Sequence, residues 1–315
     1  MTAKVFIDGD VGTTGLQIKS RLEGRSDIEL LRLDDAVRKD PVKRAEVLNR
    51  ADISILCLPD DASIEAASMV TNPNARLIDA STAHRIADGW VYGFPEYNRT
   101  QAAEIAKAKR VANPGCYALT SISILYPLVD AGILPTDWPV TINAISGYSG
   151  GGKGMIATFE DKENAAYTET PFFAYGLGLN HKHLPEITHW SGISHSPLFV
   201  PSVGRYAQGM IVQIPLPLWS MSGNFKAKDV HQALSDHYDE QNFVSVAPLS
   251  ETQELSKLEP EGLNNTNELR LHVFTDASSE QVVVAGLLDN LGKGASGQAV
   301  QNLNLMLNVD ESTGL

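Results

Sequence analysis

A cysteine that is placed to act as a nucleophile lies in the segment Asn113-Pro114-Gly115-Cys116-Tyr117. The Pro-Gly pair favours a turn, and the apolar helical pattern of residues 118–129 follows at once, so Cys116 is expected in the first turn of a helix. The free N–H groups and the dipole there lower a thiol pKa. The same N–H groups, with the side chain of Asn113, could stabilise an oxyanion when the thiolate attacks a carbonyl. The pattern favours covalent catalysis by Cys116 over a small buried cysteine.

Two histidines that could transfer protons occur in Asn180-His181-Lys182-His183-Leu184-Pro185-Glu186. Pro185 suits the first position of a helix, so His183 is expected just before that helix, where the helix N-terminus keeps the ring neutral, as a general base requires. In an extended segment His181 and His183 would share one face, as a metal-binding pair would. Metal binding needs further ligands, and no cysteine or carboxylate cluster has matching spacing. We therefore expect no metal and predict that His183 is catalytic and His181 contacts the substrate, with a structural histidine as the alternative.

A glycine-rich turn near the N-terminus could hold a dinucleotide. It reads Gly9-Asp10-Val11-Gly12-Thr13-Thr14-Gly15, after an apolar run at residues 3–8 and at the start of a helical pattern over residues 14–22. Glycines permit a tight turn and close approach to a pyrophosphate, which the helix N-terminus attracts. The predicted cofactor ligands are Gly9, Gly12, Thr13, Thr14 and Gly15, and the alternative is a plain glycine turn.

The residues after the second predicted strand leave the choice of dinucleotide open. Asp34 and Asp35 could bind a ribose 2′-hydroxyl, which favours NAD, whereas Arg32, Arg38 and Lys39 could bind a 2′-phosphate, which favours NADP. The two signals conflict.

Further candidate ligands lie in polar loops. Arg85, in a loop after a predicted strand, and Arg205 could each bind a substrate carboxylate or phosphate, although a surface salt bridge is an equal alternative for both. We predict that the loop with Ser149 and Gly150 lies against the nicotinamide. We also predict that the turn with Gly294 and Ser296 caps the cofactor.

The elements that must position these residues follow two patterns. In the first third, strands are expected at residues 3–8, 29–33, 53–58, 76–79 and 110–112, with helices at 14–22, 41–50 and 63–70. This alternation predicts an α/β unit with a parallel, doubly wound (Rossmann) sheet. Strands at 140–145, 210–216, 269–275 and 281–286 predict a mixed or antiparallel sheet with helices on one face, in which the last two strands form a hairpin. The final helix is expected at 295–307.

Composition excludes several classes of protein. The chain has 315 residues, of which 43% are hydrophobic, and a net charge of −13, which disfavours a nucleic-acid partner. It has only two cysteines, so a disulfide framework is not expected, and Cys57 is interpreted as a buried strand residue. The apolar run near the N-terminus is too short for a signal peptide and no apolar run is long enough to span a membrane, so we expect a soluble, cytoplasmic protein with no membrane partner.

Seven motifs together resemble one enzyme family, the N-acetyl-γ-glutamyl-phosphate reductases of arginine biosynthesis, in their shorter-chain branch. The motifs span nearly the whole chain and are GDVGTTG, DASTAHR, GFPEYN, NPGCY, SGYSGGGKG, NHKHLPEI and KGASGQAVQNLNL. The family commonly has arginine where this chain has Lys182, and its long form has proline where this chain has Ala118.

The resemblance implies an NADP(H)-binding domain at residues 1–115, completed by a C-terminal helix at 295–315. It implies an α+β catalytic and oligomerisation domain at 116–294, like that of glyceraldehyde-3-phosphate dehydrogenase, and a homo-oligomer (dimer or tetramer). The implied oxidoreductase reaction is NADPH-dependent reduction of N-acetyl-γ-glutamyl phosphate to the 5-semialdehyde with release of phosphate. Cys116 would carry the acyl group as a thioester and His183 would be the base.

Three other functions remain open from the residues alone. An aspartate-semialdehyde dehydrogenase would share the cysteine, the cofactor and the hydride step. A cysteine hydrolase would need no dinucleotide, and a nucleotide sensor would bind the cofactor without needing Cys116.

Overall fold

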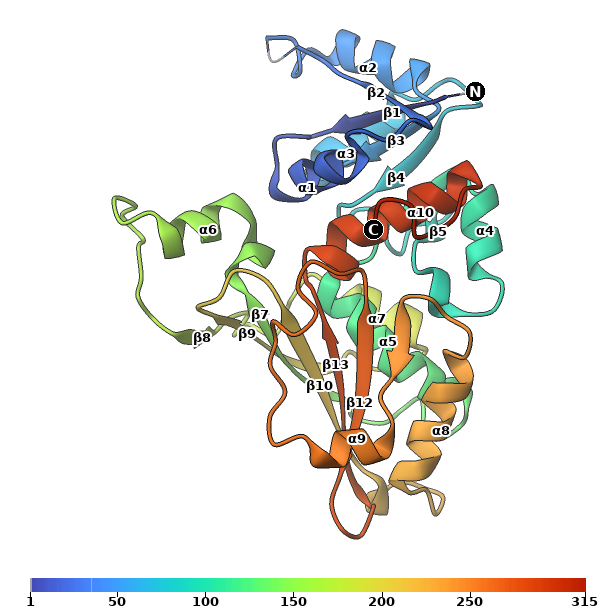
Figure 1. Cartoon of the computed structure of the whole chain (residues 1–315), viewed down its shortest axis with the longest axis vertical. Coiled ribbons are helices and arrows are strands. Elements are labelled where there is room, and N and C mark those ends of the chain that lie inside the picture. The colour runs from blue at the N-terminus through green and yellow to red at the C-terminus, as the bar shows by residue number, and fades with distance from the viewer. Residues whose placement is uncertain (1, 35) are drawn as a thin grey trace. The chain divides into compact units, whose positions relative to one another are not determined.

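The chain forms two units, each built around its own β-sheet (Figure 1). The computed structural model describes residues 2–34 and 36–315. The first unit contains residues 1–95, 99–115 and 295–315, and the second contains residues 96–98 and 116–294. Residues 96–98 belong to the second unit although the chain on both sides of them belongs to the first, which the sequence pattern did not predict.

The first unit has a six-stranded parallel sheet with the strand order β2-β1-β3-β4-β6-β5. The strands are β1 (Ala3–Asp8), β2 (Ile28–Leu31), β3 (Ile53–Leu56), β4 (Arg76–Asp79), β5 (Val91–Tyr92) and β6 (Arg110–Ala112). The predicted parallel, doubly wound sheet is confirmed. Its order places the carboxyl ends of β1 and β2 side by side, at the edge where such sheets bind ligands.

Both faces of this sheet are covered by helices, because its strands carry apolar residues on both sides. Apolar residues of α1 (Thr13–Leu22), α4 (Gln101–Lys107) and α10 (Gly297–Leu307) share one core cluster with Val5 and Ile7 of β1. Residues of α2 (Pro41–Arg50) and α3 (Asp60–Ser68) share the other cluster with Phe6. The C-terminal helix α10 is thus part of the core of the first unit.

Several predicted bounds need correction. The second and third strands end two residues early, at Leu31 and Leu56, and α3 begins at Asp60 rather than at residue 63. Asp60 and Asp61 favour the first turn of a helix through its dipole. Cys57 therefore follows β3 and is only partly buried, instead of lying inside a strand. Desolvation raises the pKa of its thiol to about 12.

The second unit has a seven-stranded mixed sheet with the order β11-β12-β13-β10-β7-β9-β8. Its strands are β7 (Thr141–Gly147), β8 (Phe172–Ala174), β9 (Leu198–Gly204), β10 (Met210–Pro217), β11 (Val244–Val246), β12 (Leu269–Thr275) and β13 (Gln281–Leu288). The predicted hairpin is confirmed, since β12 and β13 pair antiparallel. Strands β8, β9 and β11 were not predicted, because two are only three residues long and β9 contains Pro201.

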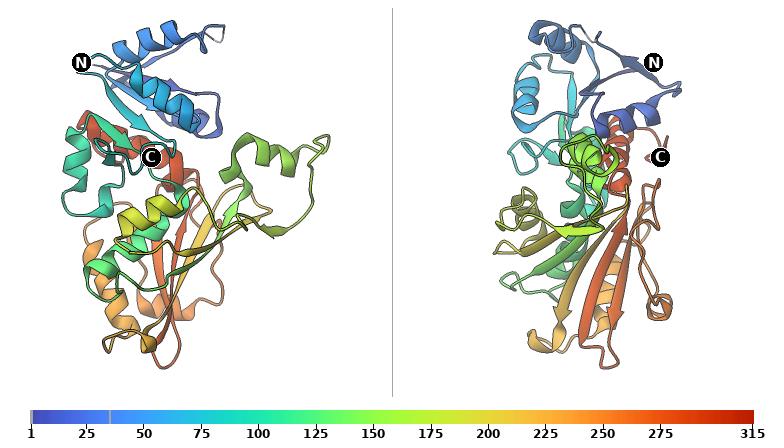
Figure 2. Two further views of the ribbon diagram at one scale, coloured as in Figure 1. Left: turned by 180° about the vertical axis from the view of Figure 1, so that it is seen from behind. Right: turned by 90° about the vertical axis from the view of Figure 1, so that its left-hand side faces the viewer.

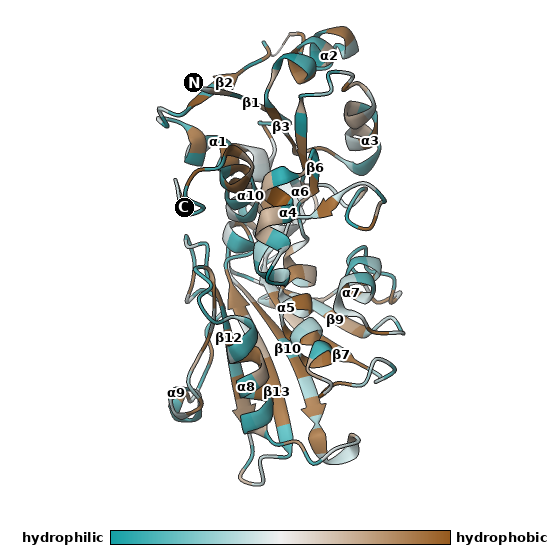
Figure 3. Ribbon diagram, turned by 90° about the vertical axis from the view of Figure 1, so that its right-hand side faces the viewer, coloured by the Kyte–Doolittle hydropathy of each residue, from teal (hydrophilic) through white to brown (hydrophobic). Residues whose placement is uncertain are grey.

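Helices of the second unit pack mainly on one face of its sheet (Figure 2). Helix α5 (Cys116–Asp130) contacts α7 (Leu184–Ser191), α8 (Ala227–His237) and the central strands β10 and β13. The central strands are largely hydrophobic, whereas α8 alternates in hydropathy (Figure 3). Helix α9 (Leu249–Glu254) contacts β12, and the segment with α6 (Gly152–Glu160) extends away from α5 and α8 (Figures 1 and 2). Within residues 2–34 and 36–315, no helix combines the length and apolar character needed to cross a bilayer.

Candidate active site

The glycine turn after β1 has a backbone that only glycine can form. Gly9 has φ +93°, and a Cβ there would lie 2.3 Å from the carbonyl oxygen of Cys57. A Cβ at Gly15, inside α1, would lie 2.3 Å from the carbonyl oxygen of Gly9. Gly12 is the residue before α1, and its N–H donates to the carbonyl of Gly9 at 3.0 Å. The turn therefore brings backbone to the carboxyl edge of the sheet, as a pyrophosphate site requires.

A cavity of about 500 Å³ lies beside this turn in the first unit. Among its lining residues, five are cationic and two are acidic: Lys19, Arg32, Arg38, Lys39 and Arg44, with Asp8 and Asp10. Asp34 is not among the lining residues, and Asp35 lies outside the described residues. The cavity thus combines the glycine turn with an excess of positive charge, so the residues present fit a dinucleotide.

Three of the cationic side chains at this cavity, Lys19, Arg32 and Arg44, pair with carboxylates. Arg44 donates to the buried carboxylate of Asp8 through Nη2 at 2.9 Å and Nε at 3.2 Å. Burial raises the pKa of Asp8, and Arg44 opposes that rise. The predicted ligand Arg32 donates to Glu23 at 3.0 Å, but both side chains are more than half exposed. Such an exposed pair is weak, so it does not hold Arg32 firmly, and contact of Arg32 with the cofactor stays a prediction.

Cys116 is the first residue of α5 and is partly exposed. This is the position that the sequence pattern predicts. The backbone of Gly294 lies against it, because a Cβ at Gly294 would be 2.8 Å from the Cβ of Cys116. The first turn of a helix presents its backbone N–H groups outward along the helix axis, which is the geometry that oxyanion donors require.

His183 and His181 lie in the same unit as Cys116. His183 is the residue before α7, as predicted, and is 5% exposed, whereas Pro185 is the second residue of the helix rather than the first. The rings of His181 and His183 are edge to face at 4.8 Å, and the backbone N–H of His183 donates to Nδ1 of His181 at 3.2 Å. The ring of Tyr117, the residue after Cys116, lies 5.8 Å from His181 and 5.9 Å from His183. Tyr117 therefore links the cysteine to both histidines.

Two tyrosines near the sulfur were not predicted as site residues. Tyr175 donates to the hydroxyl of Tyr117 at 3.4 Å, and Tyr117 donates to the carbonyl of Ser202 at 3.3 Å. Desolvation raises the pKa of Tyr175 to about 12 and that of Tyr117 well above its usual value, and the charge of Cys116 adds to both shifts. Both phenols are neutral near pH 7. Tyr117 could have been identified as a site residue because it follows the cysteine directly in sequence, whereas nothing in the sequence indicates Tyr175.

Two predicted substrate ligands, Arg85 and Asn113, lie in the first unit and brace the loop that leads to Cys116. Arg85 is 7% exposed and donates through Nε to the carbonyl of Asn113 at 3.0 Å. The amide of Asn113 donates to the carbonyl of Ala295 at 3.1 Å, and its oxygen accepts from Asn302 at 3.0 Å. Contact of either residue with substrate stays a prediction, and the structure gives both a bracing role.

Arg205 ties the α6 segment to β9. It donates to backbone carbonyls of Thr168 and Phe159, and its guanidinium lies over the rings of Phe159 and Tyr167 at 5.8 and 5.9 Å. The residue is nevertheless exposed, so its predicted contact with a substrate anion stays a prediction.

The predicted cofactor ligands outside the glycine turn are mostly enclosed. Ser149 is 5% exposed and accepts from Asn290 at 3.0 Å, whereas Gly150 is exposed. Ser296 is fully buried, and its hydroxyl donates to Gln17 at 2.9 Å. Cofactor contact by these residues and by Gly294 stays a prediction. No metal-binding group of three His, Cys, Asp or Glu residues occurs within the described part of the chain.

The fold and site define a two-domain semialdehyde dehydrogenase. Residues 7–105 match the family described as semialdehyde dehydrogenase, NAD binding domain, and residues 116–290 match the family described as semialdehyde dehydrogenase, dimerisation domain. Solved structures share the fold. Aspartate semialdehyde dehydrogenase II from Vibrio cholerae superposes with a TM-score of 0.69 at 16% identity, covering 98% of this chain and 99% of that one. Aspartate semialdehyde dehydrogenase with NADP from Candida albicans superposes with a TM-score of 0.65 at 12% identity, covering 98% of this chain and 99% of that one.

The particular family follows from relatives that are much more similar in sequence. An N-acetyl-gamma-glutamyl-phosphate reductase from Chelativorans sp. (strain BNC1) is 53% identical, with 98% of this chain and 99% of the relative covered. The reductase from Rhizobium meliloti (strain 1021) is 50% identical over the same shares. N-acetyl-gamma-glutamyl-phosphate reductase 2 from Nostoc sp. (strain PCC 7120) is 48% identical over 99% of each chain. The chain belongs to the N-acetyl-gamma-glutamyl-phosphate reductase family, and the predicted family is confirmed.

Proposed function

We propose that the chain reduces N-acetyl-γ-glutamyl phosphate to N-acetyl-glutamate 5-semialdehyde with NADPH, as a step of arginine biosynthesis. The observation that carries this proposal is the identity of about half of all residues, over nearly the full chain, to reductases of that name. The placement of Cys116 at the start of α5, with Tyr117 between it and the two histidines, supplies the chemistry.

In this mechanism the Cys116 thiolate attacks the carbonyl carbon of the acyl phosphate. The bond between sulfur and the carbonyl carbon forms. The bond between that carbon and the bridging phosphate oxygen breaks, and phosphate leaves with its electron pair. Backbone N–H groups in the first turn of α5 stabilise the oxyanion of this step. The neutral phenols of Tyr117 and Tyr175 add no negative charge beside the thiolate.

When bound, NADPH would supply the hydride that reduces the carbonyl carbon of the thioester held by Cys116. His183 takes the proton of the Cys116 thiol, gives it to the alkoxide oxygen formed at this carbon to yield the thiohemiacetal, and removes it again as the C–S bond breaks. The aldehyde then leaves, and the sulfur of Cys116 returns as a thiolate. Because His183 is mostly buried before α7, water has little access to the base.

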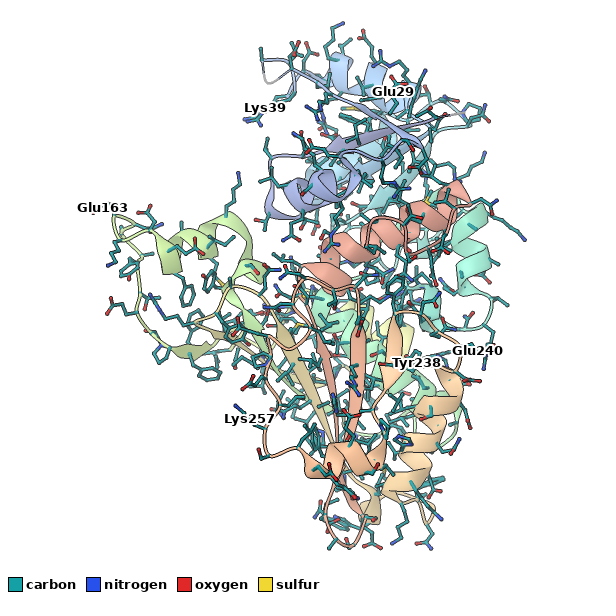
Figure 4. The ribbon with its side chains drawn as sticks, in the orientation of Figure 1. Glu29, Lys39, Glu163, Tyr238, Glu240 and Lys257 are labelled. Atoms are coloured by element: carbon teal, nitrogen blue, oxygen red, sulfur yellow. The ribbon has the colours of Figure 1, made fainter. Side chains whose placement is uncertain are left out.

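The charge at the cavity of the first unit favours NADP over NAD. Arg32, Arg38 and Lys39 line this cavity at the end of β2, where a 2′-phosphate would bind, and Asp34 does not line it. Lys39 is on the edge of the first unit in Figure 4. Arginine and lysine supply the charge-assisted hydrogen bonds that a phosphate needs.

We further propose a cytoplasmic homo-oligomer that assembles through the second unit. Residues 116–290 match a dimerisation domain. Three apolar side chains that are neighbours across strands β10, β13 and β12 are only partly buried. They are Pro215, Val283 and Phe274. A second copy of the chain would cover them.

The test is phosphate-dependent reduction of NADP⁺ by N-acetyl-glutamate semialdehyde, which is the reaction in reverse. We expect turnover with this aldehyde, little with aspartate semialdehyde, and less with NAD⁺ than with NADP⁺. Omission of phosphate should stop the reaction after one turnover. Turnover only with aspartate semialdehyde would overturn the substrate assignment, and multiple turnovers without phosphate would overturn phosphate as the group that releases the thioester.

A further inference from the structure

A fully enclosed ion pair lies one residue away from the backbone that contacts Cys116. The Nζ of Lys293 is 2.7 Å from Oε1 of Glu96, and the two side chains are 0% and 2% exposed. Both residues belong to the second unit, although Glu96 lies between segments of the first unit in the sequence. The mechanism described above uses neither residue.

The surroundings of this pair are apolar and aromatic. The Lys293 ammonium lies 5.4 Å from the centre of the Phe243 ring. Desolvation raises the pKa of Tyr238, and the charge of Glu96 adds to this rise. Tyr238 is a buried phenol at the end of α8 (Figure 4), and its hydroxyl donates to the carbonyl of Ser123. Removing two charges from water into such surroundings costs several kcal/mol per ion, so a buried pair is weak evidence for a contribution to stability alone.

The backbone at Lys293 forms a well-anchored turn. Residues Gly292–Ser296 form a π-helical turn, a type that is rare and frequent at functional sites. The carboxylate of Asp289 accepts from the N–H groups of Leu291 at 2.9 Å and Asn265 at 2.8 Å, and the N–H of Gly294 donates to the carbonyl of Asp289 at 3.0 Å. These bonds anchor the start of the turn, and the Lys293 side chain anchors its middle.

We propose that the buried Lys293–Glu96 pair positions the nucleophile, because it fixes the turn whose Gly294 backbone lies against Cys116. The space between them is too small for one methyl group, since a Cβ at Gly294 would be 2.8 Å from the Cβ of Cys116. A shift of the turn therefore moves the Gly294 backbone that lies against Cys116, and the sulfur moves with it. A misplacement of about 1 Å in a reacting group costs about a hundredfold in rate. Lys293 and Glu96 are thus positioning residues that act through Gly294, and this role rests on the proposed function of Cys116.

The experiment compares the variant Lys293→Met with Lys226→Met. Lys226 forms an ion pair with Glu280 in the same unit, but both side chains are about a third exposed. Each rate is divided by the amount of Cys116 that reacts with substrate in a single-turnover burst. Lys293→Met should lower kcat by about tenfold to a hundredfold with a substrate KM within about twofold of the parent. Lys226→Met should keep both constants.

Two further variants separate positioning from folding. Breaking one side of a buried pair can unfold a protein, whereas removal of both charges is often tolerated, so Lys293→Met/Glu96→Gln and Glu96→Asp are measured alongside. If Lys293→Met or the double variant melts as the parent does and keeps the parent kcat, the pair is only structural and the proposal is overturned.

Gly294→Ala tests the contact itself. It should reproduce the kcat loss without disturbing the ion pair, while Gly262→Ala, whose added Cβ would meet only ordinary contacts, should not. A parent-like kcat for Gly294→Ala would overturn the proposed route to Cys116.

The rate of Cys116 alkylation by iodoacetamide gives a readout that does not depend on the substrate. Mass spectrometry follows the peptide that contains Cys116 separately from the peptide that contains Cys57. We expect slower alkylation in the folded Lys293 variant than in Lys226→Met, because the sulfur leaves its place at the start of α5. If the parent does not turn over the acyl phosphate, the proposed function fails, and the alkylation rates still decide the positioning role. Equal alkylation rates would overturn it.

Discussion

The backbone of the glycine turn gives a prediction whose size follows from the structure. Gly9→Ala places a Cβ 2.3 Å from the carbonyl oxygen of Cys57, at a residue with φ +93°. The positive φ costs about 1–2 kcal/mol for a residue with a Cβ. Relief of the clash costs about 1–3 kcal/mol more, as overpacking usually does. The total of about 2–5 kcal/mol should lower Tm by roughly 5–15 °C.

A matched control separates the two contributions. Gly24 has φ +85°, but a Cβ there would meet nothing within 4 Å. Gly24→Ala should therefore show only the conformational cost of about 1–2 kcal/mol. The clash at Gly9 should also displace the turn and weaken NADP⁺ binding by about tenfold or more, whereas Gly24→Ala should bind as the parent does.

Thermal melting and fluorescence titration with NADP⁺ measure both effects. Equal Tm values and equal NADP⁺ affinities for the two variants would refute the reasoning, because the clash would then have no consequence. A lower Tm for Gly9→Ala with parent-like affinity would refute the assignment of the turn to the cofactor.

Four further outcomes are expected. Cys116→Ala should abolish turnover and keep NADPH affinity within about twofold in a binding titration, and His183→Asn should lower kcat by about a hundredfold in steady-state assays. Lys39→Ser should raise the KM for NADP⁺ by about tenfold and leave that for NAD⁺ unchanged, since a charged hydrogen bond contributes about 1.5–3 kcal/mol. Burial lowers the pKa of His272, so the His272 ring binds a proton at higher pH in the unfolded chain than in the folded protein. Stability should therefore fall as the pH drops below about 6.5, and urea midpoints of His272→Phe should lack this part of the loss.

Local signals made much of the fold predictable. The β-branched run of β1 and the proline at the start of α2 gave these two elements with their observed bounds. The Pro-Gly turn likewise placed Cys116 at the first residue of α5, and Pro185 placed His183 before α7. In each case the residues that determine the conformation are neighbours in the chain.

The remaining features depend on contacts between distant residues. Glu96 and Lys293 are 197 residues apart, and nothing near either of them indicates a buried charge pair. Arg85 and Arg205 have the chemistry of anion ligands, but the structure shows that backbone carbonyls accept hydrogen bonds from both. A sequence specifies which groups a side chain can bind, and only the tertiary fold selects among them.

The most direct test of the account is to trap the acyl group on the protein. N-acetyl-glutamate semialdehyde and NADP⁺ are mixed with the enzyme without phosphate, so that no acceptor releases the thioester. We predict one NADPH formed per active site and the added mass of an N-acetylglutamyl group on the peptide that contains Cys116, both absent in Cys116→Ala. A stoichiometric burst that leaves Cys116 unmodified, or an acyl group on another residue, would contradict the account.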